Sequence, residues 1–197
     1  VSCYEKSLKI NNDLRDLEGA GKNLNNIANV YCSQCRWDEA IEYFVRSLKV
    51  SLDIGDRVSE AHTLGNFGAT YHERSLLNKA VEYYEKSLLI KDELDDHLGR
   101  VGTLNNLAVI HHQQGRWEES IRCHQENLEF RHQLGDRRGE GESFTGLANV
   151  YKSQGKWSNA LENYQKSLEI YRETGDRQAE AQCLYNFGAV YDVQNDC

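Results

Sequence analysis

A repeat of forty residues runs through this chain and constrains its fold more than any other feature. Three sets of positions carry the repeat, one acidic and two apolar. They are Asp16, Asp56, Asp96, Asp136 and Asp176; Leu24, Leu64, Leu104, Phe144 and Leu184; and Leu48, Leu88, Leu128 and Leu168. A fixed period of this size indicates stacked units, each of which buries its apolar side against the next. We therefore expect one elongated array of repeats.

Each unit reads as two helices joined by a short turn. In the unit from Gly135 to Thr174, apolar residues first recur at i, i+3, i+4 and i+7, which predicts one apolar face on a helix. A second set with helical spacing begins at Trp157. Between the two sets lies a short polar turn whose Gly155 suits a left-handed backbone conformation. Each unit is thus expected to be a helical hairpin, and the fold class all-α.

The junctions between units contain helix stop and start signals. Three of them read Gly-Asp-Arg, where Gly can end one helix and Asp can cap the next. The junction at Asp95 and Asp96 lacks the Gly. We expect a single array over 1–197, with a second helix of a partial repeat at 1–14, repeats at 15–54, 55–94, 95–134 and 135–174, and a first helix of a partial repeat at 175–197.

The pattern resembles the tetratricopeptide repeat (TPR), whose signature is W-x2-L-G-x2-Y followed by A-x3-F. The first full unit has Leu24-x2-Ile27-Ala28-x2-Tyr31 and then Ala40-x3-Phe44. The period exceeds the usual length for the family, and the chain contains no Pro. In this it is similar to the long repeats of Pins/LGN-type adaptors and of prokaryotic TPR signalling proteins. The resemblance implies a right-handed superhelical solenoid that binds a protein or peptide segment on its concave face.

Charge and composition weigh against several classes of partner. The net charge is −8, and no run of Lys or Arg is present, so we expect neither nucleic-acid binding nor binding to an anionic membrane. No apolar run reaches the about 20 residues of a membrane span, and no signal peptide is visible. The six cysteines follow no disulfide spacing pattern, which favours reduced thiols and a cytoplasmic location.

Polar side chains on the first helix of each hairpin, opposite its apolar face, are the candidate binding residues. Asn recurs there in a column that Gly146 interrupts, and an Asn side chain both donates and accepts hydrogen bonds. The alternative is that these Asn residues bond neighbouring helices or face water. The predicted peptide-binding set is Lys22, Asn25, Asn26, Asn29, Asn66, His72, Asn105, Asn106, His112, Asn149, Lys152 and Asn186.

Metal, cofactor and catalytic roles are not expected. Cys32, His72 and His112 occupy equivalent positions in three units and could form a row, but successive units lie about 10 Å apart. Cys32 and Cys35 form a single C-x2-C, in which Cys35 takes the place of a turn Gly. No nucleophile stands in a recognisable motif with a base, and no Gly-rich loop follows a strand.

We therefore expect a non-catalytic scaffold that binds a protein or peptide segment along the Asn column. The first alternative is a sensory or regulatory domain of a larger signalling protein. The second is head-to-tail self-association through the terminal half-repeats, in which Tyr4, Leu8, Leu184 and Phe187 would be exposed contact residues.

Overall fold

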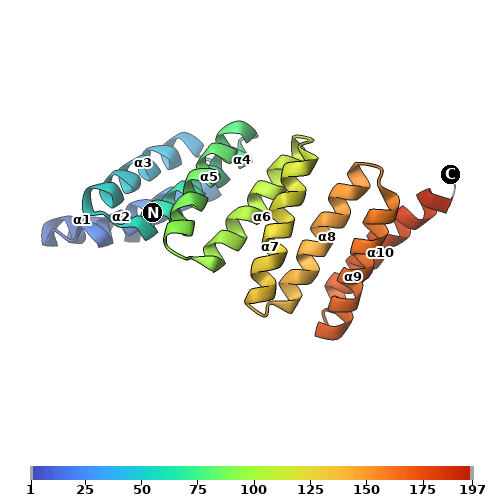
Figure 1. Cartoon of the computed structure of the whole chain (residues 1–197). Coiled ribbons are helices and arrows are strands. Elements are labelled where there is room, and N and C mark those ends of the chain that lie inside the picture. Colours follow the sequence, from blue (N-terminus) through green and yellow to red (C-terminus); the bar gives the residue numbers. More distant parts are fainter. Residues whose placement is uncertain (1, 196–197) are drawn as a thin grey trace. The chain divides into compact units, whose positions relative to one another are not determined.

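The computed structural model describes residues 2–195, and within them the chain forms ten α-helices and no strand (Figure 1). They form two compact units, Val1–Thr103 and Leu104–Cys197, and the division falls within the sixth helix. The helices are α1 (Ser2–Leu14), α2 (Leu17–Ser33), α3 (Trp37–Ile54), α4 (Arg57–Glu73), α5 (Leu77–Glu93), α6 (His97–Gln113), α7 (Trp117–Gln133), α8 (Arg137–Ser153), α9 (Trp157–Thr174) and α10 (Arg177–Asn195).

The all-α class and the helical hairpins predicted from the period are confirmed. In the first unit α2 packs on α3 and α4 on α5, and in the second α8 packs on α9. The assignment of these helices to one array with the boundaries given above stays a prediction. Residues 1, 196 and 197, including Cys197, lie outside the described part of the chain.

The repeated Asp starts one helix in every hairpin. Its carboxylate accepts a hydrogen bond from the backbone N–H three residues on, at 2.9 to 3.0 Å, which satisfies a donor that the helix leaves unpaired. The Arg of the Gly-Asp-Arg junction adds ion pairs. Arg137 contacts Glu140 in its own helix and Glu173 at the end of α9, and Arg57 repeats the pattern with Glu60 and Glu93.

Left-handed residues end the helices at equivalent places. Gly55, Gly135 and Gly175 have φ between 68° and 72°. Two residues keep this conformation without being glycine. Asp95 lies at the junction before α6 and has a φ of 52°, and Cys35 lies in the turn between α2 and α3 and has a φ of 57°. Cys35 therefore stands in for a turn glycine, as the sequence indicated.

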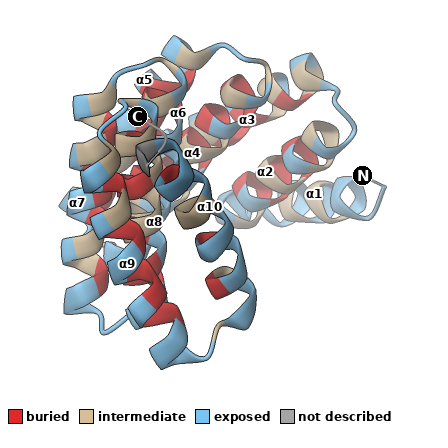
Figure 2. Cartoon of the chain, turned by 90° about the vertical axis from the view of Figure 1, so that its right-hand side faces the viewer, coloured by how far each residue is buried: buried red, intermediate tan, exposed pale blue. Residues whose placement is uncertain are grey.

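Small residues allow the helices to approach closely, and buried residues gather on the faces where helices meet (Figure 2). Ala28, Ala40, Ala108 and Ala148 are fully buried. At Gly68 an added Cβ would lie 2.8 Å from the ring of Tyr84, so the close approach there requires the glycine.

Several aromatic residues are only partly buried or are exposed. Trp37, Trp117 and Trp157 are only partly buried, because they begin helices and keep one edge at the surface. Tyr191 is 53% exposed, and a Cβ at Gly188 would meet no atom within 4 Å, since no described helix covers this face of α10. Leu8 and Phe187 are partly buried, whereas Tyr4 and Leu184 are exposed.

None of the described helices combines the length and the apolar character that a membrane span requires.

Candidate functional site

Each compact unit contains a pocket lined by both polar and apolar side chains, bounded by the first helices of two successive hairpins, with one second helix behind them. The pocket of the first unit, about 350 Å³, lies between α2 and α4, with Ser47 of α3 at its back. The pocket of the second unit, about 360 Å³, lies between α6 and α8, with His124 of α7 at its back. We call them the α2/α4 pocket and the α6/α8 pocket.

The α2/α4 pocket contains three of the predicted binding residues, Lys22, Asn25 and Asn26. Lys22 forms an ion pair with Glu18 at 2.5 Å, which raises the pKa of its ammonium group. The carboxamide oxygen of Asn25 accepts a hydrogen bond from Asn66 Nδ2 at 3.1 Å. The side chain of Asn26, by contrast, is partly buried and bonds to no described residue.

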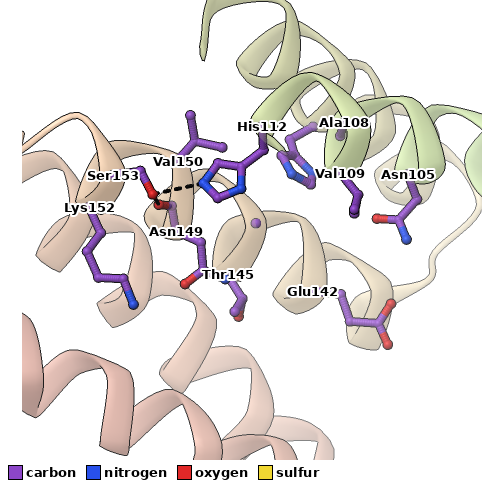
Figure 3. Close-up of a pocket in the computed structure, with 12 residues that line it drawn as sticks. Asn105, Ala108, Val109, His112, Glu142, Thr145, Asn149, Val150, Lys152 and Ser153 are labelled. Carbon is purple, nitrogen blue, oxygen red and sulfur yellow. Dashed lines mark hydrogen bonds between the residues drawn. The ribbon is translucent and has the colours of Figure 1, made fainter. Parts of the chain in front are cut away.

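The α6/α8 pocket contains four predicted binding residues, Asn105, His112, Asn149 and Lys152 (Figure 3). His112 Nε2 lies 2.8 Å from Ser153 Oγ, and this contact joins α6 to α8 across the pocket. Burial lowers the pKa of His112, and the nearby Lys152 ammonium lowers it further. Asn149 Oδ1 accepts a hydrogen bond from Tyr164 at 2.5 Å, while Lys152 forms no ion pair with any residue of the described part of the chain.

Five predicted residues lie outside the lining of these two pockets. Asn29 and Asn106 are exposed, Asn66 and Asn186 are partly buried, and His72 is partly buried near the end of α4. The carboxamides of Asn66 and Asn149 make hydrogen bonds within the chain. The groove as a whole, and peptide binding by this set, stay predictions.

His124 was not predicted from the sequence as a functional residue. Among the side chains of the α6/α8 pocket whose pKa is shifted, it is the most deeply buried. It is 7% exposed, and burial lowers its pKa to about 4, with smaller contributions from His112 and Arg131. A signal was present: His124 stands where Phe44, Tyr84 and Tyr164 stand in the other hairpins.

Among residues 2–195, no three His, Cys, Asp or Glu side chains gather closely enough to hold an ion. Cys32 Sγ instead contacts Thr70 Oγ1 at 3.3 Å, and burial raises the pKa of its thiol.

A family model of the tetratricopeptide repeat matches residues 20–93, 100–173 and 141–197. These matches cover most of the chain. The chain belongs to the tetratricopeptide repeat family. The resemblance drawn from the sequence is thereby confirmed at the level of the family, and the paired helices of the structure are TPR hairpins.

Three solved structures illustrate the likeness of fold. BtubC (BKLC) from P. vanneervenii matches with a TM-score of 0.85 and 19% identity, over 99% of this chain and 83% of its own. A Signal Transduction ATPase with Numerous Domains from Pyrococcus horikoshii, which has a tetratricopeptide repeat sensor, matches with 0.80 and 17%, over 87% of this chain and 27% of its own. The apo form of RapI matches with 0.82 and 13%, over 98% and 55%.

The chain thus spans about a quarter and about half the length of the last two proteins. At these identities the likeness concerns the fold alone. A comparison with curated proteins found no match.

Proposed function

We propose that this TPR chain is a non-catalytic module that binds an extended segment of another protein on the side formed by the first helices of its hairpins. The observation that carries the proposal is the same in both units: a pocket between two successive first helices contains a polar side chain that has no partner among residues 2–195. Asn26 is that residue in the α2/α4 pocket, and Lys152 in the α6/α8 pocket. Such groups are available to hydrogen-bond a ligand without breaking an internal contact.

A peptide-display selection tests the proposal. Short random peptides are selected on the immobilised chain, and the affinity of each selected peptide is then measured by fluorescence anisotropy. The double variant Asn26→Ala with Lys152→Ala is expected to bind about tenfold or more weakly, since each substitution removes a ligand contact of about 1 kcal/mol or more.

A matched variant serves as the control. Lys49→Ala with Asn159→Ala changes the same residue types at exposed positions on α3 and α9, outside both pockets, and should leave affinity unchanged. Equal binding by the wild type and the pocket variant, with an intact circular dichroism spectrum, would show that the binding surface lies elsewhere.

A sensory role is a second candidate, which the repeat sensor of the Pyrococcus horikoshii ATPase favours. In that case ligand binding changes the conformation of the array. Small-angle X-ray scattering with and without a saturating selected peptide would report a change in radius of gyration. An unchanged scattering curve would argue against this candidate.

Self-association is a third proposal, supported by apolar side chains at the surface of α1 and α10. Helix α1 has no buried residue, and Leu184 and Tyr185 of α10 are 43% and 75% exposed. A molar mass that stays at the monomer value by static light scattering at high protein concentration would exclude it.

We place the protein in the cytoplasm, since the five described cysteines are free.

A further inference from the structure

The α6/α8 pocket departs from the repeat at two positions that contact each other. His124 replaces the aromatic residue found at Phe44, Tyr84 and Tyr164, and Gly146 replaces the Asn of the column. A Cβ placed on Gly146 would lie 2.4 Å from Cε1 of His124 and 2.7 Å from each of its ring nitrogens. The imidazole therefore needs the space that any side chain at position 146 would take, and the two departures form one local change.

The buried imidazole has a hydrogen-bonding capacity that the protein does not use. His124 is more than nine-tenths buried. Its Nδ1 is not accessible to solvent and has no hydrogen-bond partner among residues 2–195. Because burial holds the ring neutral at pH 7, it has one N–H donor and one acceptor nitrogen. A buried polar group without a partner costs about 1–3 kcal/mol. Because His124 lines the pocket, a ligand toward which the ring turns to form a hydrogen bond gains affinity.

The other groups of the pocket define what such a ligand must offer. Asn149 lies three residues after Gly146, so the two are neighbours on one face of α8. Its oxygen is taken by Tyr164, which leaves the amide N–H groups as donors. Lys152 and Glu142 lie at opposite ends of the pocket (Figure 3), and Arg131 holds Glu142 at 2.7 Å.

Glu142 is paired with Arg131 at one end of the pocket and Lys152 lies at the other end, so no unpaired charge stands beside Gly146 in the middle (Figure 3). The groups near Gly146 comprise an imidazole that can accept a hydrogen bond and an amide that can donate one. A neutral group that both donates and accepts is therefore the best complement. A carboxylate of the same size can only accept, so it bonds the imidazole only in the tautomer whose N–H faces it, whereas a carboxamide bonds either tautomer. An apolar chain leaves the imidazole without a partner.

We propose that the α6/α8 pocket binds the carboxamide side chain of an Asn or Gln residue in the bound segment. The inference rests on the proposed function and names the side chain that this pocket selects. The amide hydrogens donate to the imidazole of His124, and the amide oxygen accepts from the Asn149 side chain. Since a carboxamide supplies both groups at once, one ligand residue satisfies both.

The test uses three blocked amino acids of similar size: N-acetyl-glutamine methylamide, N-acetyl-glutamate methylamide and N-acetyl-methionine methylamide. Each is titrated into the isotope-labelled full chain, and binding is followed by the backbone resonances and by the imidazole nitrogen resonances of His124. We expect the glutamine probe to bind about tenfold more tightly than the other two and to shift the His124 nitrogens.

Two variants locate the effect. His124→Phe installs the residue found at Phe44, so the fold is retained, and it should lower the affinity for the glutamine probe about tenfold. His97→Phe is the matched control, because His97 is an exposed histidine at the start of α6 outside both pockets, and it should leave that affinity unchanged.

Tighter binding of the glutamate or methionine probe, or unchanged affinity in His124→Phe, overturns the inference. The wild-type comparison of the three probes decides the question even where the variant fails to fold. The proposed function is judged separately by the selected peptides. Peptides that respond to Asn26→Ala with Lys152→Ala, together with equal affinities for the three probes, would remove the carboxamide inference and leave the proposed function standing.

Discussion

Lys91 extends an ammonium group from α5 into the contact with α6 and has no carboxylate directly against it. It is 8% exposed, and its Nζ donates to Thr103 Oγ1 at 2.7 Å and to the Gly99 carbonyl at 3.2 Å. Burial lowers its pKa, and Asp96 opposes this effect only in part. Thr103 also donates to the Gly99 carbonyl at 2.9 Å, so these two groups remain bonded to each other without the lysine.

We therefore expect Lys91→Met to keep or raise the free energy of unfolding, by up to about 1 kcal/mol, because an apolar chain of similar length avoids desolvating a charge. Urea unfolding measures the effect, with Lys49→Met, an exposed lysine of α3, as the control. A loss of more than about 1 kcal/mol would mean that the two hydrogen bonds outweigh the desolvation.

His124 should make the free energy of unfolding depend on pH in the mildly acidic range. Its pKa is about 4 in the folded chain, chiefly through burial, against an ordinary value of 6.5. Above pH 6.5 the ring is neutral in both the folded and the unfolded chain. Between pH 6.5 and 4 the unfolded chain takes up the proton and the folded chain does not, so stability falls as pH falls, by up to about 3 kcal/mol.

The charged and titratable groups of the surrounding helices bear on this titration. His112 of α6 and Arg131 of α7 disfavour a second positive charge, and Lys152 and Glu142 of α8 line the same pocket with opposite signs. Urea unfolding of wild type and His124→Phe at pH 7 and pH 4.5 isolates the histidine from the carboxylates. A stability difference between them that is the same at both pH values would contradict the prediction.

At the scale of helices and turns, the junction before α6 uses a less suitable residue than the three junctions that contain glycine. Asp95 has a φ of 52°, where Gly55, Gly135 and Gly175 occupy the same place. Asp95→Gly should raise the free energy of unfolding by about 0.5–1 kcal/mol, because a left-handed conformation costs a residue with a Cβ about 1–2 kcal/mol, partly offset by the flexibility of glycine in the unfolded chain.

The same substitution in a helix interior provides the contrast. Lys49→Gly, at an exposed position of α3, should lower the free energy of unfolding by about 1 kcal/mol. Both values come from chemical denaturation under identical conditions. Destabilisation by Asp95→Gly would show that the aspartate side chain contributes more at this turn than its backbone conformation costs.

The sequence predicted these elements well because each signal is local. The Asp caps and the glycine positions act through the backbone within three or four residues, so one sequence suffices to read them. The partly buried Trp residues were harder to foresee. How much of a side chain at the start of a helix is covered depends on the packing of neighbouring helices, which a single period does not specify.

At the scale of the whole chain, the predicted Asn residues lie on the first helices of the hairpins, but the period could not say which of them are available to a ligand. Asn25 and Asn66 lie 41 residues apart and bond to each other, because the repeat that aligns them also brings them within reach. The side-chain oxygen of Asn149 accepts a hydrogen bond from Tyr164, which lies on the second helix of the same hairpin. The sequence shows His124 and Gly146 only as departures from the repeat, and the structure is needed to show that they contact each other.

The apolar surfaces of α1 and α10 lead to a prediction about assembly. Ile10 and Leu14 of α1 are 57% and 72% exposed, and Leu184 and Tyr191 of α10 are 43% and 53% exposed. Burying one such side chain fully contributes about 1.5–3 kcal/mol, so several together can hold two copies. We expect the weight-average molar mass by static light scattering to rise with concentration, and Leu184→Glu with Tyr191→Glu to suppress the rise. The control is Leu89→Glu, at a 62% exposed site on α5, which should not suppress the rise. Equal suppression by this control would mean that the copies associate through scattered apolar contacts rather than through α10.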